Sequence, residues 1–396
     1  MKKRLVIVGA GPGGYVAALR AAQAGAAVTL VERDLVGGTC LNRGCIPTKA
    51  LLASAAALAH ARAGDMFGFT VQGEIRPDLA RMMDRKERIV TQLRSGVETL
   101  LKRAGVEVLR GTGRLTGPRT VVVEGDSDAM TVEADRVIIA TGSEPARLPA
   151  FDFSHPCILT STEALELREI PSSMLIVGAG VIGCEFASFF AELGTQVTMV
   201  EMLAQMLPLE DVRLSKQFQA AYRKRGIQVL LKTKVDAVVR YGEKDVTARL
   251  SDGSEVQVEK ILVSVGRTPN TSDLGLDLAG VTTDSRGYIV VDDHLETSAP
   301  GVYAIGDVNG GLLLAHVASH EGLVAVANAL ADDPTERRKR DLRSTPSCTY
   351  AYPEVASVGL SEEQALEAGY EPVTGTYRFA ALGKALALGE EAGYVQ

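Results

Sequence analysis

Two cysteines near the amino terminus have the type and spacing that most directly suggest chemistry. Cys40 and Cys45 are separated by four residues, and Lys49 follows Cys45 by four positions, which is one helical turn. In a helical turn the two thiols could approach within the Cα separation that a disulfide requires, roughly 4.4 to 6.8 Å. A nearby ammonium group favours a thiolate over a thiol. The segment therefore predicts a redox-active pair of thiols.

A zinc site is the alternative for these two cysteines. It would need two further Cys or His residues at suitable spacing, which the neighbouring sequence does not supply. His316 and His320 are four positions apart, but no third ligand is evident, so we expect no metal site. Five cysteines in a chain of this length cannot form a disulfide scaffold. We expect Cys157, Cys184 and Cys348 to be small core residues.

A glycine-rich motif occurs twice. The pattern G-x-G-x-x-G spans residues 9–14 and 178–183, and each copy follows a short apolar run that is typical of a strand. In both copies an acid, Glu32 or Glu201, lies 23 positions after the first glycine. Such a turn lets a pyrophosphate approach a helix N-terminus, while the acid accepts a hydrogen bond from an adenosine ribose. Two dinucleotide sites are predicted. The alternative is two Rossmann-like units whose glycine turns bind no dinucleotide.

The elements that must position these residues follow an α/β pattern. We expect helices at residues 54–63 and 78–104, and strands at 5–8, 28–31, 106–109, 120–123, 136–140, 175–177, 197–200, 228–231, 235–240, 246–250 and 260–265. Another apolar run ends at Asp307, where a carboxylate would point into the ligand crevice of an open sheet. The basic run Arg337–Arg340 lies beside Asp332, Asp333 and Glu336, and we expect a solvated linker at a domain boundary.

Length and composition limit the classes of function. The 396 residues allow two or three domains. With 49 acids, 42 bases and a formal charge of -7, the chain lacks the basic field that nucleic acid binding needs. No apolar stretch reaches the roughly 20 residues of a membrane span, and the apolar run after the basic start breaks at glycines. We therefore expect a cytoplasmic protein without a nucleic acid or membrane partner.

Several segments together resemble a known family. The two glycine motifs, residues 37–49, 139–143, 265–270 and 303–307 are similar, in order, to the class I pyridine nucleotide-disulfide oxidoreductases. The resemblance implies two Rossmann-like domains, for FAD and NAD, and the start of an α+β dimer-interface domain. It implies these boundaries: a first part of the FAD domain with the redox disulfide at 1–147, an NAD domain at 148–271, a second FAD or central part at 272–343, and a dimerisation domain at 344–396.

The resemblance also assigns residues to each site. For FAD it implies Gly9, Gly11, Gly14, Glu32, Lys49, Gly113, Thr141, Gly142, Ser143, Asp307, Ala315 and His316, with Asp307 on the ribityl chain and the helix that begins at Ala315 against the flavin pyrimidine. For NAD it implies Gly178, Gly180, Gly183, Glu201, Val235 and Gly266. It pairs Glu185 with Lys49 beside the flavin N5. The implied catalytic residues are Cys40, Cys45, Lys49 and Glu185.

The implied reaction is a relay of two electrons. Residues 40–49 are most similar to family members that oxidise the dihydrolipoamide of lipoyl domains in 2-oxo-acid dehydrogenase or glycine-cleavage complexes. The resemblance implies that the substrate attacks the Cys40 sulfur of a Cys40–Cys45 disulfide, which opens and leaves Cys45 as a thiolate against the flavin. The electrons then pass to FAD and reduce NAD+. Another disulfide reductase of the family and a non-catalytic flavin-binding protein are the alternatives.

The carboxyl-terminal residues depart from the family pattern. Residues 344–396 resemble only the beginning of the dimerisation domain, and a homodimer is expected if that domain is complete. The family's acid–base histidine and glutamate belong to the missing part, and none of the five histidines, His60, His155, His294, His316 and His320, lies in such a motif. For a chain that ends at Gln396 we expect NADH-dependent dye reduction and very slow oxidation of dihydrolipoamide.

Overall fold

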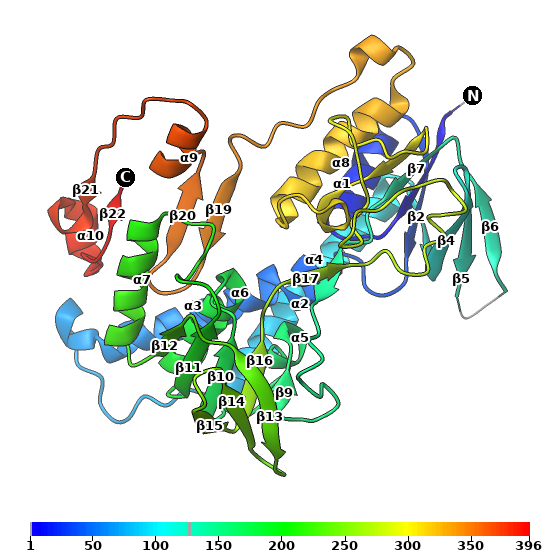
Figure 1. Ribbon diagram of the computed structural model, residues 1–396. Coiled ribbons are helices and arrows are strands. Elements are labelled where there is room, and N and C mark those ends of the chain that lie inside the picture. The colour runs from blue at the N-terminus through cyan, green and yellow to red at the C-terminus, as the bar shows by residue number, and fades with distance from the viewer. Residues whose placement is uncertain (1, 126–127) are drawn as a thin grey trace. The chain divides into compact units, whose positions relative to one another are not determined.

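The computed structural model describes residues 2–125 and 128–396 (Figure 1), which form two compact units. The first unit contains the described residues of Met1–Pro47, Glu87–Pro145 and Arg267–Leu342. The second unit contains Thr48–Lys86, Ala146–Gly266 and Arg343–Gln396. Each unit is built around its own parallel sheet.

The sheet of the first unit has the strand order β18-β7-β1-β2-β3, with every neighbouring pair parallel. Its strands are β1 (Arg4–Val8), β2 (Ala27–Glu32), β3 (Glu107–Arg110), β7 (Arg136–Ile139) and β18 (Val302–Ala304). Side chains alternate along β1, so Leu5 and Ile7 join the core with helices α1 (Pro12–Gln23) and α8 (Ala315–Leu330). Val6 and Val8 join a second core with the antiparallel strands β4 (Thr112–Gly117), β5 (Thr120–Glu124) and β6 (Met130–Glu133).

The second unit repeats this plan. Its parallel sheet has the order β12-β11-β10-β16-β9, from β9 (Ile158–Leu159), β10 (Ser173–Val177), β11 (Gln196–Glu201), β12 (Gln228–Leu231) and β16 (Lys260–Val263). An antiparallel meander, β13 (Val235–Tyr241), β14 (Val246–Leu250) and β15 (Glu255–Val258), lies between β12 and β16 in sequence, as β4 to β6 lie between β3 and β7 in the first unit. Met174 and Ile176 join the core that includes α6 (Val181–Glu192) and α7 (Val212–Lys224), whereas Leu175 and Val177 join the core of the meander.

The remaining elements complete the described part of the chain. Those before residue 343 are α2 (Gly38–Arg43), α3 (Cys45–Arg62), η1 (Gly64–Phe67), α4 (Leu79–Arg103), β8 (Ser143–Pro145), α5 (Ser161–Ala164), β17 (Arg267–Pro269), η2 (Gly306–Asn309) and η3 (Pro334–Glu336). Those after it are β19 (Pro346–Thr349), β20 (Val355–Val358), α9 (Glu362–Glu367), β21 (Tyr377–Arg378), η4 (Phe379–Ala381), α10 (Gly383–Leu388) and β22 (Tyr394–Val395). No helix of the described residues is both long and apolar enough to cross a bilayer.

The predicted α/β class with two Rossmann-like cores is confirmed. Cys40 and Cys45 form the predicted close pair, but they do not share a single helical turn. Helix α2 ends at Arg43, and Gly44 has φ -150° and ψ -111° before α3 begins at Cys45. A Cβ atom on Gly44 would lie 3.0 Å from the carbonyl oxygen of Thr39, so the chain turns tightly there. The two thiols therefore belong to two helices joined by a glycine.

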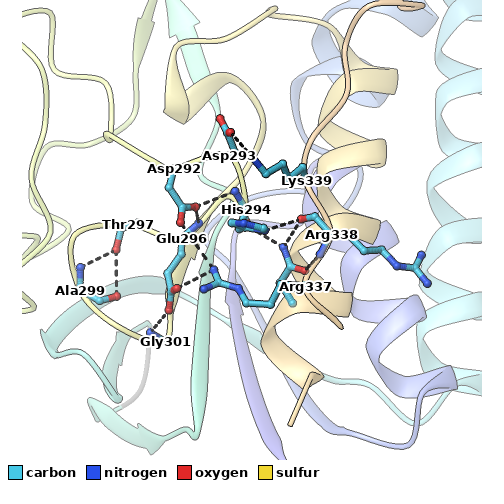
Figure 2. Close-up of polar contacts among 11 residues, drawn as sticks. Asp292, Asp293, His294, Glu296, Thr297, Ala299, Gly301, Arg337, Arg338 and Lys339 are labelled. Carbon is cyan, nitrogen blue, oxygen red and sulfur yellow. Dashed lines mark hydrogen bonds and ion pairs between the residues drawn. The ribbon is translucent and has the colours of Figure 1, made fainter. Parts of the chain in front are cut away.

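The basic run at Arg337–Arg340 is also different from the prediction. Figure 2 shows Arg337, Arg338 and Lys339 beside the acidic turn at Asp292–Glu296, all in the first unit. The side chains of Arg337 and Arg340 are only 23% and 25% exposed, and each forms an ion pair with a glutamate. The run is therefore an ordered part of the first unit rather than a solvated linker.

Candidate active site and dinucleotide sites

The first glycine loop connects β1 to α1 in the first unit. Gly9 has φ +103°, and a Cβ atom there would lie 2.3 Å from the carbonyl oxygen of Ala140. A Cβ atom on Gly14 would lie 1.8 Å from the carbonyl oxygen of Gly9, so only glycine lets the helix approach the loop. Gly11 is the N-cap residue of α1, and the nearest atom to its hypothetical Cβ is 4.0 Å away. This open N-terminus can receive a pyrophosphate.

The second glycine loop, between β10 and α6, has the same geometry. Gly178 has φ +101°, and its Cβ atom would lie 2.5 Å from the carbonyl oxygen of Ser264. The Cβ atom of Gly183 would lie 2.1 Å from the carbonyl oxygen of Gly178. Gly180 is the N-cap residue of α6, as Gly11 is of α1. The two glycine loops thus each lead into a helix whose N-terminus has no side-chain cap.

The acids at the ends of β2 and β11 hold these loops. Glu32 accepts hydrogen bonds from the backbone N–H groups of Ala10 (2.7 Å) and Asp34 (2.9 Å). Glu201 accepts the equivalent bonds from Ala179 (2.8 Å) and Leu203 (2.8 Å). Each carboxylate oxygen keeps a further lone pair that a ribose hydroxyl can use. The sequence predicted ribose contacts, but it did not show that the acids also fix the glycine loop.

The two candidate redox cysteines are half-buried in the first unit. Cys40 lies in α2, where the Asn42 side chain donates to the carbonyl oxygens of Gly38 (3.0 Å) and Val36 (3.1 Å). Cys45 is the first residue of α3, a helix of 18 residues. The positive end of a helix dipole stabilises an anion at such a position. The local structure therefore suits a thiolate at Cys45.

A polar cluster surrounds Asp307 in η2. The Ser143 hydroxyl donates to Asp307, and Arg267 donates to both the hydroxyl and the carbonyl oxygen of Ser143 at 2.6 Å. The Arg267 guanidinium lies 3.6 Å from Asp307. Burial lowers the pKa of Arg267, while Asp307 and then Cys45 act in the opposite direction. The sequence singled out Ser143 and Asp307 but gave Arg267 no role, although Arg267 lies in segment 265–270, which resembles the family.

Other predicted FAD residues lie in the same unit. Thr141 and Asn270 exchange two hydrogen bonds, at 2.7 and 2.9 Å, and the Asn270 N–H donates to Gly142. Gly113 packs in β4, where an added Cβ atom would lie 3.0 Å from the Val8 side chain. Helix α8 begins at Ala315, and its N-cap residue, Leu314, provides no side-chain cap. Among the described residues no group of three His, Cys, Asp or Glu side chains could hold a metal ion.

The second unit brings together Lys49, Glu185 and a residue that the sequence did not single out, Tyr350. Glu185 is buried in α6 and accepts a hydrogen bond of 3.0 Å from the Tyr350 N–H. The Lys49 ammonium lies 3.8 Å from the centre of the Tyr350 ring. Burial raises the pKa of Glu185, while the Tyr350 N–H and Lys49 lower it. Tyr350 therefore contacts both members of the predicted pair.

The remaining predicted NAD residues also lie in the second unit. Val235 begins β13 and pairs with Leu250 of β14. Gly266 has φ +125°, a conformation that glycine adopts easily. Of the three isolated cysteines, Cys157 and Cys184 are fully buried, as predicted for core residues, whereas Cys348 is half-buried. Cys348 also raises the pKa of Tyr350, mainly by charge repulsion.

Comparison with protein families gives two matches. The family described as pyridine nucleotide-disulphide oxidoreductase matches residues 3–322. The dimerisation domain of the same family matches residues 345–396. Together the two matches cover most of the chain.

Curated relatives carry one name. Dihydrolipoyl dehydrogenase from Chlorobaculum tepidum is 44% identical over 99% of this chain and 83% of the relative. The proteins of that name from Chlamydia muridarum and Bacillus subtilis are 43% and 41% identical, over 98% and 99% of this chain and 82% and 84% of the relatives.

Solved structures give the same fold. A crystal structure of LpdA from Mycobacterium tuberculosis has a TM-score of 0.91 at 29% identity, and covers 99% of this chain and 86% of that one. The HOCl-induced flavoprotein disulfide reductase RclA from Escherichia coli has a TM-score of 0.87 at 30% identity, and covers 99% of this chain and 85% of that one.

Proposed function

Because the chain belongs to the pyridine nucleotide-disulfide oxidoreductase family and is an FAD- and NAD-dependent oxidoreductase, we propose that it catalyses the reaction of a dihydrolipoyl dehydrogenase. In this reaction dihydrolipoamide loses two electrons and two protons and becomes lipoamide. NAD+ takes up a hydride, and one proton is released. The observation that carries the proposal is the thiol pair Cys40 and Cys45, which lies in α2 and at the start of α3, just after β2 and Glu32.

The glycine loops suit the two cofactors. Gly9, Gly11 and Gly14 bind the FAD pyrophosphate in this proposal, and Glu32 binds its adenosine ribose. Gly178, Gly180, Gly183 and Glu201 do the same for NAD, with Val235 and Gly266 at its two ends. The open positions at Gly11 and Gly180 support the proposal, because each leaves room for a phosphate against an uncapped helix.

The residues around Asp307 hold the flavin side of FAD in the proposal. Ser143 and Arg267 fix the Asp307 carboxylate, so that it can accept a hydrogen bond from the ribityl chain. Gly113, Thr141 and Gly142 line the same site. Ala315 and His316 present the N-terminus of α8 to the flavin pyrimidine, where a helix N-terminus stabilises negative charge.

Cys40 and Cys45 exchange electrons with the substrate. One substrate thiolate attacks Cys40 of the Cys40–Cys45 disulfide and forms a mixed disulfide, which releases Cys45 as a thiolate at the N-terminus of α3. The second substrate thiol then attacks the mixed disulfide, which releases lipoamide and leaves two reduced cysteines. Bound FAD would supply the chemistry that links these thiols to NAD+, namely acceptance of an electron pair and transfer of a hydride.

Lys49 and Glu185 tune the charge beside the flavin. Lys49 supplies a positive charge one helical turn after Cys45, which favours the thiolate form. Glu185 is held by the Tyr350 N–H and lies within the electrostatic reach of Lys49. We propose that the two act as a pair beside the flavin N5.

The dimerisation-domain match supports a homodimer. We propose the lipoyl domains of 2-oxo-acid dehydrogenase or glycine-cleavage complexes as partners, since the relatives share the name of that activity. We also propose the cytoplasm as the compartment, because thiols outside the redox pair are typical of a reducing environment.

A second candidate is another disulfide reductase of the family. The similarity to RclA, which is named a flavoprotein disulfide reductase, favours it. The identity to RclA is 30%, however, against 41–44% to the three dihydrolipoyl dehydrogenases. The test is steady-state NAD+ reduction by the full gene product with dihydrolipoamide, and NADH oxidation with lipoamide, glutathione disulfide and cystine. A clear preference for the lipoyl substrates supports the proposal, and equal or better turnover of another disulfide refutes it.

A further inference from the structure

Glu321 is a fully buried carboxylate that the proposed reaction does not use. It lies in α8 of the first unit and is 0% exposed. One of its oxygens accepts hydrogen bonds from the Gly306 N–H (2.6 Å) and the Asn309 side chain (2.9 Å). The other oxygen accepts a hydrogen bond of 2.9 Å from the Arg340 guanidinium, which also supplies the balancing charge.

The groups that Glu321 holds form the turn that contains Asp307. Gly306 and Asn309 are the first and last residues of η2, so Asp307 lies between them. Gly306 has φ +71°, and Asn309 also accepts a hydrogen bond from the Gly311 N–H at 3.1 Å. Because both ends of η2 bond to one buried carboxylate, the position of Glu321 sets the position of the turn.

Arg340 reaches Glu321 from residues 337–340, which we call the strap. Figure 2 shows Arg337, Arg338 and Lys339 of the strap beside the labelled residues from Asp292 to Gly301. Both backbone groups of Arg338 bond to the Asn328 side chain of α8, at 2.6 and 2.9 Å. The Arg340 N–H bonds to the carbonyl oxygen of Asp293 at 2.8 Å. Asn328 and Glu321 are seven positions, or two turns, apart in α8, so the strap follows one face of that helix.

Two other cations of the strap, Arg337 and Lys339, form ion pairs with residues outside η2. Arg337 forms an ion pair of 2.8 Å with Glu296, and Lys339 forms an exposed ion pair of 3.2 Å with Asp293. Neither partner belongs to η2. The chain thus offers two matched controls for Arg340 within three residues of it.

We propose that Glu321 and Arg340 are positioning residues for FAD, because they hold the η2 turn in the conformation in which Asp307 meets the cofactor. The inference rests on the proposed contact of Asp307 with the ribityl chain. A buried carboxylate that loses its partner carries an uncompensated charge, and it then moves or takes up a proton. Either change loosens the bonds to Gly306 and Asn309, and a site that is poorly preorganised binds its ligand less well.

The test is the rate at which FAD leaves the holoenzyme, followed by the rise of flavin fluorescence after dilution. A hydrogen bond to a charged group is typically worth enough to change an equilibrium about 10- to 100-fold. We expect FAD release from Arg340→Met to be faster than from the wild type by about this factor. Arg337→Met and Lys339→Met are expected to stay within about twofold of the wild type.

A merely structural role for Arg340 would give a different pattern. The free energy of unfolding of each variant is measured in urea, and the rates of FAD release are compared for equal losses of that free energy. If Arg340→Met and Arg337→Met then release FAD at similar rates, the inference is overturned. If Arg340→Met does not fold, Arg340→Lys replaces it, because the charge remains and only the paired geometry is lost. Faster release from Arg340→Lys than from Arg337→Lys supports the inference, and equal release overturns it.

Two further variants separate this inference from the proposed function. If Glu321→Gln and Arg340→Met act through one pair, the double variant releases FAD no faster than the worse single variant, whereas additive effects contradict the pair. Asp307→Ala tests the ribityl contact itself. Unchanged FAD release in Asp307→Ala refutes that contact, whatever Arg340→Met does. Fast release in Asp307→Ala with wild-type release in Arg340→Met refutes only the positioning role.

Discussion

Glu201 should make the enzyme discriminate against NADP. Glu201 is 8% exposed at the end of β11, and both of its carboxylate oxygens accept backbone hydrogen bonds of 2.8 Å. These bonds hold the charge where the ribose 2'-hydroxyl is expected, and no arginine occurs from Met202 to Asp211 to receive a 2'-phosphate. At about 4 Å and an effective dielectric constant near 20, two like charges repel by about 4 kcal/mol. NADPH should therefore be about a thousandfold poorer than NADH.

Replacing Glu201 with Ala should remove most of this discrimination. The repulsion disappears, so NADPH gains relative to NADH, and the ratio of the two efficiencies should fall from about 10³ to within about tenfold of one. NADH itself should become poorer, because the loop loses two bonds to a charged acceptor and the ribose loses its partner.

The assay is kcat/KM for NADH and for NADPH with an artificial dye as electron acceptor. Glu32→Ala is the matched control, because Glu32 makes the equivalent bonds in the first unit. After saturation with FAD, this variant should keep the wild-type ratio of NADH to NADPH. Comparable efficiencies in the wild type, or an unchanged ratio in Glu201→Ala, would refute the reasoning.

Three further outcomes are expected. Cys45→Ser should lose the long-wavelength charge-transfer band of the two-electron-reduced protein, while Cys348→Ser should keep it, and a band that survives in Cys45→Ser contradicts the roles of the two thiols. Burial raises the pKa of Glu185 above the ordinary value of 4.5. At pH values just above 4.5 the folded protein therefore keeps a proton on Glu185 that the unfolded chain has lost, and the free energy of unfolding falls as pH rises through this range. Urea unfolding from pH 4.5 upwards should show a shallower fall for Glu185→Gln, and parallel curves would exclude this contribution. Tyr350→Leu should lower the free energy of unfolding by about 0.5–1 kcal/mol relative to Tyr350→Phe, which keeps the ring under Lys49, and equal stabilities of the two variants would exclude the ring contact.

The glycine loops and their acids could be predicted because their chemistry is encoded in short segments. The first glycine and the acid are 23 positions apart in both copies, and this spacing corresponds to one strand, turn, helix and strand. Apolar runs located most strands of the two parallel sheets, since the apolar residues of such strands are contiguous and buried on both faces. Periodicity could not show the break at Gly44, which depends on the close approach of Gly44 to Thr39.

Contacts between distant residues were outside the reach of sequence reasoning. Tyr350 and Glu185 are 165 positions apart, and no pattern in either segment indicates their hydrogen bond. The strap illustrates the same limit, because a basic run beside acidic residues has the same composition whether it is exposed to solvent or packed against the protein. The outcome depends on Asn328, which bonds to the backbone of Arg338, and on the buried charge of Glu321. Such residues are recognised by their burial and partners, which only the folded chain provides.

The most direct test of the proposed electron path is to identify the thiols that NADH generates. Oxidised holoenzyme is mixed anaerobically with one equivalent of NADH, quenched with an alkylating reagent and analysed by peptide mass spectrometry. We predict that two new labelled thiols appear per FAD, at Cys40 and Cys45, and that lipoamide added before the quench removes both labels. Reduction of the flavin without new thiols at these two cysteines, or with labels that lipoamide leaves unchanged, would contradict the account.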